Sequence, residues 1–140
     1  MMGAMSRIFV ILSGVLGFSA VALGAFGAHG LAETLKLNGS RAVAAWDTAA
    51  QYQMYAALAV IAAGLVAPHL QCKGTTIAAA LLTLGAVLFS GSLYVWSVTQ
   101  VRGLMIATPI GGLLMILGFT ALAWTCFACC GGERKEGSGP

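Results

Sequence analysis

The stretch IFVILSGVLGFSAVALGAFGA, Ile8–Ala28, contains no charged residue. A helix needs about 20 apolar residues to cross a bilayer hydrocarbon core about 30 Å thick, so the stretch predicts a membrane span. Arg7 and the small residues Ala20–Ala22 also fit a cleaved signal peptide loosely. Because the apolar run continues past that cleavage point, we favour a retained span.

Three more apolar stretches follow, and they predict spans at about 44–67, 76–98 and 104–129. The second is centred on Met54–Val66, which is short. It reaches span length only if the helix begins near Ala44, which would leave Asp47 and Gln51 at the water interface. In the fourth, Pro109 lies in the opening turns, where its missing N–H costs little.

Composition supports a membrane protein. Of the 140 residues, 59% are hydrophobic and 8% are charged, and the mean hydropathy is +0.93. Soluble domains carry roughly 25% charged residues, so we expect the lipid bilayer to cover much of this surface. The net charge of +3 comes from scattered residues, and no basic block alternates with aromatic residues. Nucleic acid is therefore not an expected partner.

The connections determine the expected topology. The polar segment His29–Gln53 mixes charged residues with leucines and suits a short amphipathic helix on the membrane surface. The other two connections, Pro68–Gly74 and Gln100–Gly103, are short, which forces neighbouring spans to run antiparallel. No strand-like alternation is present. The sequence predicts an all-α, integral membrane, up-down-up-down four-helix bundle, with this interfacial helix between spans one and two. Residues 1–130 form its single domain, and residues 131–140 form a flexible polar tail.

Orientation depends on the basic residues near the span ends. Four lie on the side of the termini and three on the other, which favours both termini inside. The two groups are Arg7, Lys73, Arg134 and Lys135 against Lys36, Arg41 and Arg102.

Small residues are placed where helices need to approach closely in lipid. Ala20, Gly24 and Ala28 form a ridge on the first span. The third and fourth spans carry further glycines and a cluster of hydroxyls, which we expect to fix the register of the helices. These residues are Gly85, Gly91, Gly111, Gly112, Gly118, Ser90, Ser92, Tyr94, Ser97 and Thr108.

Four short motifs occur in order along the chain. Gly24–Gly30 closes the first span, Tyr52-Gln53 opens the second, Leu88–Tyr94 lies in the third, and Thr108–Gly112 begins the fourth. Together they resemble the small four-span family typified by human transmembrane protein 256 and its bacterial relatives, defined by domain of unknown function 423. The resemblance extends from the span that ends at His29 to Gly118.

This resemblance implies a four-helix membrane fold, located in the bacterial plasma membrane or in the mitochondrial inner membrane of a eukaryote. It implies no established activity. Similar relatives usually carry a histidine shortly after the Tyr-Gln pair, whereas this chain has Met54-Tyr55-Ala56. A shared metal site or proton relay is correspondingly less expected here.

Within the motifs, thirteen residues are candidates for a structural packing motif, and we expect Gly24–Gly30 and Phe89–Tyr94 to form one packed seam. The candidates are Gly24, Gly27, His29, Tyr52, Gln53, Ser90, Gly91, Ser92, Tyr94, Thr108, Pro109, Gly111 and Gly112.

Metal chemistry has little support in the sequence. His29 has no second histidine nearby, whereas a catalytic metal usually needs three protein ligands, so we favour a histidine hydrogen-bonded to a loop carbonyl. The cysteines Cys72, Cys126, Cys129 and Cys130 would lie at one membrane side. Closely spaced ligands on one helix give poor tetrahedral geometry, and ordinary thiols are favoured over zinc binding or lipidation. No cofactor is expected.

Two function classes remain. An enzyme is not expected, because no acids, bases or nucleophiles converge. An ion-coupled transporter usually has a carboxylate inside the membrane, and the apolar cores of these spans have none. We therefore favour an accessory or structural subunit, or an assembly factor, of a larger membrane complex, which would be a respiratory one if the source is mitochondrial. Other membrane-protein subunits would be its partners, and Trp46, Trp96 and Trp124 could anchor it or pack against them. The alternative is a small homo-oligomeric transporter or channel for a small solute.

Overall fold

The computed structural model describes residues 4–70 and 73–130. In this part of the chain every regular element is a helix. The elements are α1 Ala4–His29, α2 Ala32–Leu37, α3 Ser40–Leu70, α4 Lys73–Thr99, the 3-10 helix η1 Arg102–Ile106, and α5 Ala107–Cys130. The four long helices are each long and apolar enough to cross a membrane, and the predicted all-α membrane fold is confirmed.

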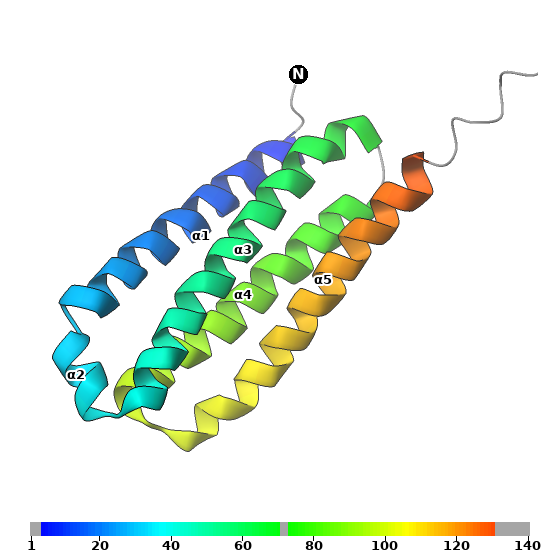
Figure 1. Cartoon of the computed structure of the whole chain (residues 1–140). Coiled ribbons are helices and arrows are strands. Elements are labelled where there is room, and N and C mark those ends of the chain that lie inside the picture. Colours follow the sequence, from blue (N-terminus) through cyan, green and yellow to red (C-terminus); the bar gives the residue numbers. More distant parts are fainter. Residues whose placement is uncertain (1–3, 71–72, 131–140) are drawn as a thin grey trace, which may run out of the picture.

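The four long helices stand side by side in chain order, each antiparallel to the next (Figure 1). α1 packs on α3, α3 on α4, and α4 on α5, whereas α1 and α5 do not touch within the described residues. α2 and η1 lie together at the end of the molecule opposite the start of α1. The bundle is therefore an open row with two edge helices, and α3 and α4 form its centre.

The helix boundaries differ from the expectations at two connections. The expected loop at Pro68–Gly74 is too long, because α3 continues through Pro68 to Leu70. A proline in the last turn removes only its own N–H bond, so the helix can end after it. The expected surface helix is α2, which has only six residues and buries Leu35. The expected tail, residues 131–140, lies outside the described residues.

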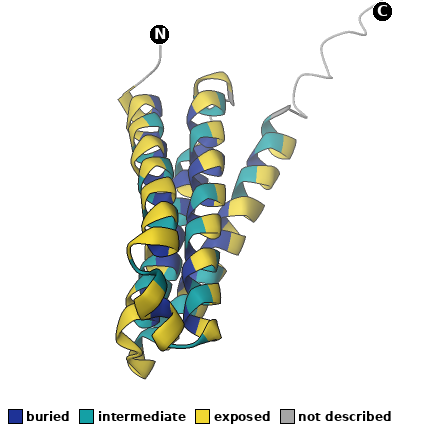
Figure 2. Cartoon of the chain, turned by 60° about the vertical axis from the view of Figure 1, so that its left-hand side comes forward, coloured by how far each residue is buried: buried dark blue, intermediate teal, exposed yellow. Residues whose placement is uncertain are grey.

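Small residues bring α3 close to both of its neighbours. Its inner faces are largely alanine, and Ala56, Val60 and Ala63 are fully buried. Figure 2 shows that buried residues follow the inner faces, while the outer faces are exposed along their length. The exposed outer residues are mostly large and apolar, as expected for surfaces that lipid covers.

Glycines set the distance between α4 and α5. A Cβ on Gly111 would lie 2.8 Å from the Cα of Phe89, and one on Gly118 would lie 2.8 Å from Cγ of Leu82. Gly85 would likewise meet the backbone of Met115 at 2.8 Å. Gly91, however, has open space around it. The close glycine packing predicted for the third and fourth spans is therefore found at Gly85, Gly111 and Gly118 but not at Gly91. At the fifth glycine, Gly112, an added Cβ would make only ordinary contact with Phe89.

Gly111 and Gly112 make a matched pair for testing this interface. Gly111→Ala should lower the free energy of unfolding by about 1–3 kcal/mol, because the new methyl group meets the backbone of Phe89 and the helices must separate. Gly112→Ala places its methyl group 3.6 Å from the Phe89 ring, which is ordinary contact, and should be neutral or stabilising by up to about 1 kcal/mol. Denaturation in mixed micelles, followed by circular dichroism, measures both. Equal losses in the two variants would contradict this account of the interface.

Candidate functional site

The four sequence motifs gather in the half of the molecule that contains α2 and η1. They lie at the end of α1, in the first half of α3, in the second half of α4 and at the start of α5. Because neighbouring helices are antiparallel, these segments come to the same end of the row (Figure 1).

Trp46 of α3 lies between the first and third motifs. Its Nε1 donates a hydrogen bond of 2.8 Å to the carbonyl of Leu23 in α1. Its ring occupies the space that a Cβ on Gly27 would need, and its centroid lies 4.7 Å from that of Tyr94 in an edge-to-face contact. Trp46 therefore joins α1 to α4 through one buried side chain.

Gln53 joins α3 to the middle of α1. Its Nε2 donates to the carbonyl of Leu16 at 3.0 Å and to Oγ of Ser19 at 2.6 Å. The side chain is buried. A buried amide needs such partners, because lipid offers none.

Hydroxyl groups make the remaining links. Ser90 Oγ in α4 donates to the carbonyl of Ala49 in α3 at 2.8 Å. Ser92 Oγ and Thr108 Oγ1 share a hydrogen bond of 2.7 Å between α4 and α5. Each pair of neighbouring helices in the row thus has at least one hydrogen bond from a motif residue or from Trp46.

Aromatic residues fill the space beside these bonds. Tyr52 is exposed, and its ring lies 5.2 Å, centroid to centroid, from that of Phe89. The hydroxyl of Tyr94 is buried and has no hydrogen-bond partner in residues 4–70 and 73–130.

The other candidates have looser surroundings. Gly24 lies in ordinary contact with Ala50, where an added Cβ would be 3.6 Å from the Ala50 Cβ. Pro109 is exposed in the first turn of α5. His29 is the exposed last residue of α1, and no described residue hydrogen-bonds to its side chain. The loop-carbonyl bond expected for His29 is therefore not found.

The cysteines form no metal site in the described chain. No three His, Cys, Asp or Glu side chains converge within residues 4–70 and 73–130. Cys126 is a half-buried free thiol, as expected, whereas Cys129 is disulfide-bonded. Cys72 and the Cys130 side chain lie outside what the structure describes.

The expected seam between Gly24–Gly30 and Phe89–Tyr94 is indirect, since α1 and α4 touch only marginally and Trp46 lies between them. From the sequence, Trp46 is expected only to anchor the chain at the interface or to contact a partner. The sequence signal for its structural role is its position seven residues before Gln53 on the same helix. Trp46 and Gln53 then share a helix face, because seven residues make about two turns.

This geometry defines a small polytopic membrane protein whose motifs hold its helices together. The sequence profile described as "Protein of unknown function (DUF423)" matches residues 23–112. The chain belongs to this family.

Bacterial relatives match along most of the chain. UPF0382 membrane protein SH2409 of Staphylococcus haemolyticus is 41% identical over 130 residues, which cover 89% of this chain and 99% of the relative. UPF0382 membrane protein YwdK of Bacillus subtilis is 41% identical, covering 81% and 90%. UPF0382 inner membrane protein YgdD of Escherichia coli is 33% identical, covering 84% and 87%. No solved structure matches the chain.

The link made by Trp46 can be tested with a matched tryptophan. Trp46→Phe removes the hydrogen bond to Leu23 and part of the buried ring, and should lower the free energy of unfolding by about 1–3 kcal/mol. Trp124→Phe changes a side chain that is 71% exposed and should stay within about 0.5 kcal/mol of the parent. Denaturation in mixed micelles compares the two. A neutral Trp46→Phe would show that this contact does not hold α1 in the row.

Proposed function

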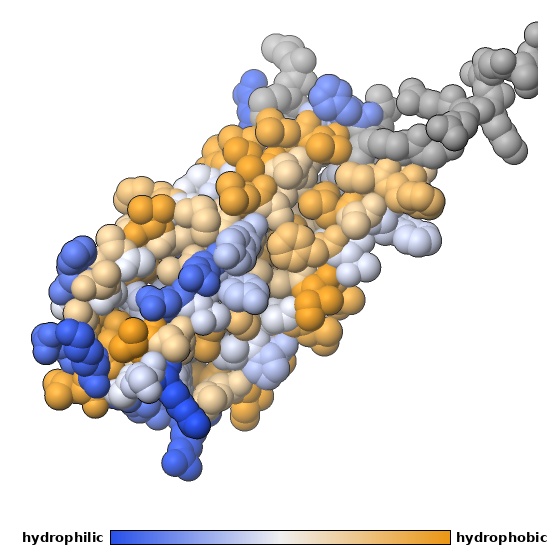
Figure 3. All heavy atoms as spheres, in the orientation of Figure 1, coloured by the Kyte–Doolittle hydropathy of each residue, from blue (hydrophilic) through white to orange (hydrophobic). Residues whose placement is uncertain are grey.

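We propose that this protein is an accessory or structural subunit that associates sideways with helices of another membrane protein. The proposal rests on a run of polar side chains on the outer face of α3. We call this run the α3 polar stripe, and it consists of Asp47, Gln51, Tyr52 and Tyr55, all exposed. Figure 3 shows hydrophilic residues running from the α2 end across the apolar surface over α3.

The depth of the stripe follows from the register of the helices. Leu16 lies near the middle of α1, and Gln53 bonds to its carbonyl. At 1.5 Å per residue, Gln51 is about 3 Å from that level and Asp47 about 9 Å. Ser90, four residues beyond the middle of α4, bonds to Ala49 and supports the same alignment. Half of a hydrocarbon core is about 15 Å, so we place the stripe within the core, deeper than the interfacial position that the sequence suggests for Asp47 and Gln51.

Lipid cannot satisfy these groups. None of the four side chains has a hydrogen-bond partner among the described residues, and the ring of Tyr52 packs against the rings of Tyr55 and Phe89. An exposed amide in hydrocarbon is costly, whereas a partner helix with polar residues would supply donors and acceptors. The open row leaves this face free for such a helix.

A second candidate function uses the same observation. If copies of this chain pair through α3, their stripes would line a polar path, as in a small homo-oligomeric transporter or channel. We favour the accessory subunit, because no charged residue of the described chain lies nearer the middle of the row than Asp47, about 9 Å from it, and the deeper members of the stripe are uncharged. The relatives named above are bacterial, so we place the protein in a bacterial plasma membrane, and nothing in these relatives supports a mitochondrial location.

The stripe is tested by Gln51→Leu in the cell of origin. After extraction in mild detergent, the parent chain should migrate with a large assembly. Gln51→Leu should lower the fraction that stays bound after washing by about fivefold, corresponding to about 1 kcal/mol for a lost interhelical hydrogen bond. Thr120→Leu is the control. Thr120 is also polar and exposed, but its hydroxyl is already bonded to the carbonyl of Ile116 in its own helix.

Size-resolved electrophoresis with mass spectrometry of the co-migrating proteins provides the measurement. Migration of the parent as a homo-oligomer alone, with solute flux in liposomes that Gln51→Leu abolishes, would replace the accessory role with transport. Equal retention of Gln51→Leu and the parent in the large assembly would remove the stripe from the interface.

A further inference from the structure

A second polar feature lies at the end of the row, separate from the α3 polar stripe. An open pocket of about 640 Å³ is formed where the α2–α3 connection faces the α4–η1 connection. Its lining residues come from three elements and two connections and are Asn38, Gly39, Ser40, Arg41, Trp96, Gln100, Arg102 and Met105. We call it the arginine pocket.

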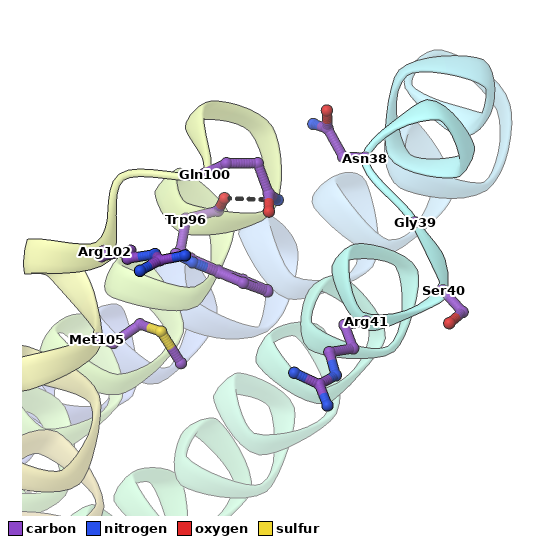
Figure 4. A pocket seen from close by; sticks show the side chains of 8 residues that line it. All are labelled: Asn38, Gly39, Ser40, Arg41, Trp96, Gln100, Arg102 and Met105. Carbon is purple, nitrogen blue, oxygen red and sulfur yellow. Dashed lines mark hydrogen bonds between the residues drawn. The ribbon is translucent and has the colours of Figure 1, made fainter.

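The two arginines are the only charged residues that line this pocket. Arg41 comes from the first turn of α3 and Arg102 from the start of η1, and Figure 4 shows them on opposite sides of the hollow. Neither has an ion pair or hydrogen bond with a described residue, and the one ion pair in that part of the chain joins Lys36 to Glu33. The pocket therefore concentrates positive charge that no carboxylate in it neutralises.

Hydrogen bonds fix the walls without using the arginines. Asn38 Nδ2 donates to the carbonyls of Ser97 and Val98 at 3.0 and 3.1 Å, which ties the α2–α3 connection to the end of α4. Gln100 Nε2 donates to the carbonyls of Trp96 and Ser97, both at 3.2 Å. Two lining residues, Gly39 with φ 99° and Gln100 with φ 56°, hold left-handed backbone conformations. A positive φ is uncommon for a residue other than glycine, so the conformation of Gln100 indicates a turn that the surrounding structure holds firmly.

The position of the pocket indicates what it would meet. Gln100 and Arg102 directly follow α4, whose length spans the hydrocarbon core, so the pocket opens at the level of the lipid headgroups. Trp96 and Met105 supply an apolar wall beside the cations, and tryptophan is typical of this level. Guanidinium groups match phosphate oxygens with paired N–H donors, and anionic phospholipid headgroups attract cationic side chains at this level of the membrane.

We propose that the arginine pocket binds a phosphate group, supplied by the headgroup of an anionic phospholipid. Arg41 and Arg102 hold the phosphate oxygens from opposite sides, and Trp96 and Met105 contact the glycerol end of the lipid. The site does not depend on the lateral association proposed above.

The test uses the purified full-length chain in a neutral detergent, titrated with phosphatidylglycerol, phosphatidylcholine or inorganic phosphate. Native mass spectrometry counts the bound molecules. The parent should retain one phosphatidylglycerol in preference to phosphatidylcholine. Arg41→Gln and Arg102→Gln should each weaken this binding about fivefold, and the double variant about 25-fold. The matched control is the double variant Arg7→Gln with Lys73→Gln, which removes two exposed cations at the opposite end and should bind as the parent does.

Each result decides the proposal. Loss of phosphatidylglycerol in the arginine variants with retention in the control supports it. Arg41→Lys with Arg102→Lys, which keeps the charge but not the paired donors, should give intermediate binding and guards against a double variant that fails to fold. Binding of inorganic phosphate without lipid would keep the phosphate chemistry but overturn the lipid source. Equal weakening in the control, or unchanged binding in the arginine variants, would overturn the site.

Discussion

Inside a bilayer, each polar group that leaves water needs a partner from the protein, because the hydrocarbon supplies no donors or acceptors. In this chain that requirement determines how the row of helices is joined. Gln53 reaches into the middle of α1, Trp46 reaches the carbonyl of Leu23, and Ser90 reaches Ala49. Close packing of alanine and glycine brings the helices near enough for these short side chains to make contact. The hydrogen bonds then fix the register, since a shift of one turn, about 5.4 Å, would break them.

The same requirement explains why α3 differs from its neighbours. Its inner faces satisfy their polar groups against α1 and α4, but Gln51, only two residues from Gln53, points away from both helices and is exposed. α3 thus uses the amide of Gln53 to bind α1 and leaves the amide of Gln51 without a partner on its outer face. α1 and α5 have no comparable unpaired amide, and the exposed hydroxyl of Thr120 is satisfied by its own helix. The asymmetry singles out the α3 face as the one that lipid covers least well.

Sequence reasoning was most successful where one property decided the outcome. Charge-free runs such as Ile8–Ala28 are sufficient to predict helices that span a membrane, and short connections are sufficient to predict antiparallel neighbours. The row could not be predicted, because apolar surfaces in lipid do not reveal whether α1 closes onto α5. Gly85 and Gly91 look alike in the sequence, yet only Gly85 meets the backbone of Met115. Trp46 and Asn38 were overlooked as structural links because their partners are backbone carbonyls, which carry no sequence signal.

The distribution of these features along the chain argues that one end of the molecule carries its distinctive chemistry. The family profile covers residues 23–112, which include the last turns of α1, all of α2, α3 and α4, and the first turns of α5. Among the described residues, the segments outside it are the greater part of α1 and of α5, which carry exposed apolar residues such as Ile11, Phe18 and Leu113. Trp46, the α3 polar stripe and the arginine pocket all lie inside the matched region. The hydrogen bonds of Asn38 attach the α2–α3 connection to the end of α4, so the walls of the pocket are held together within this chain, apart from any helix that packs on the stripe.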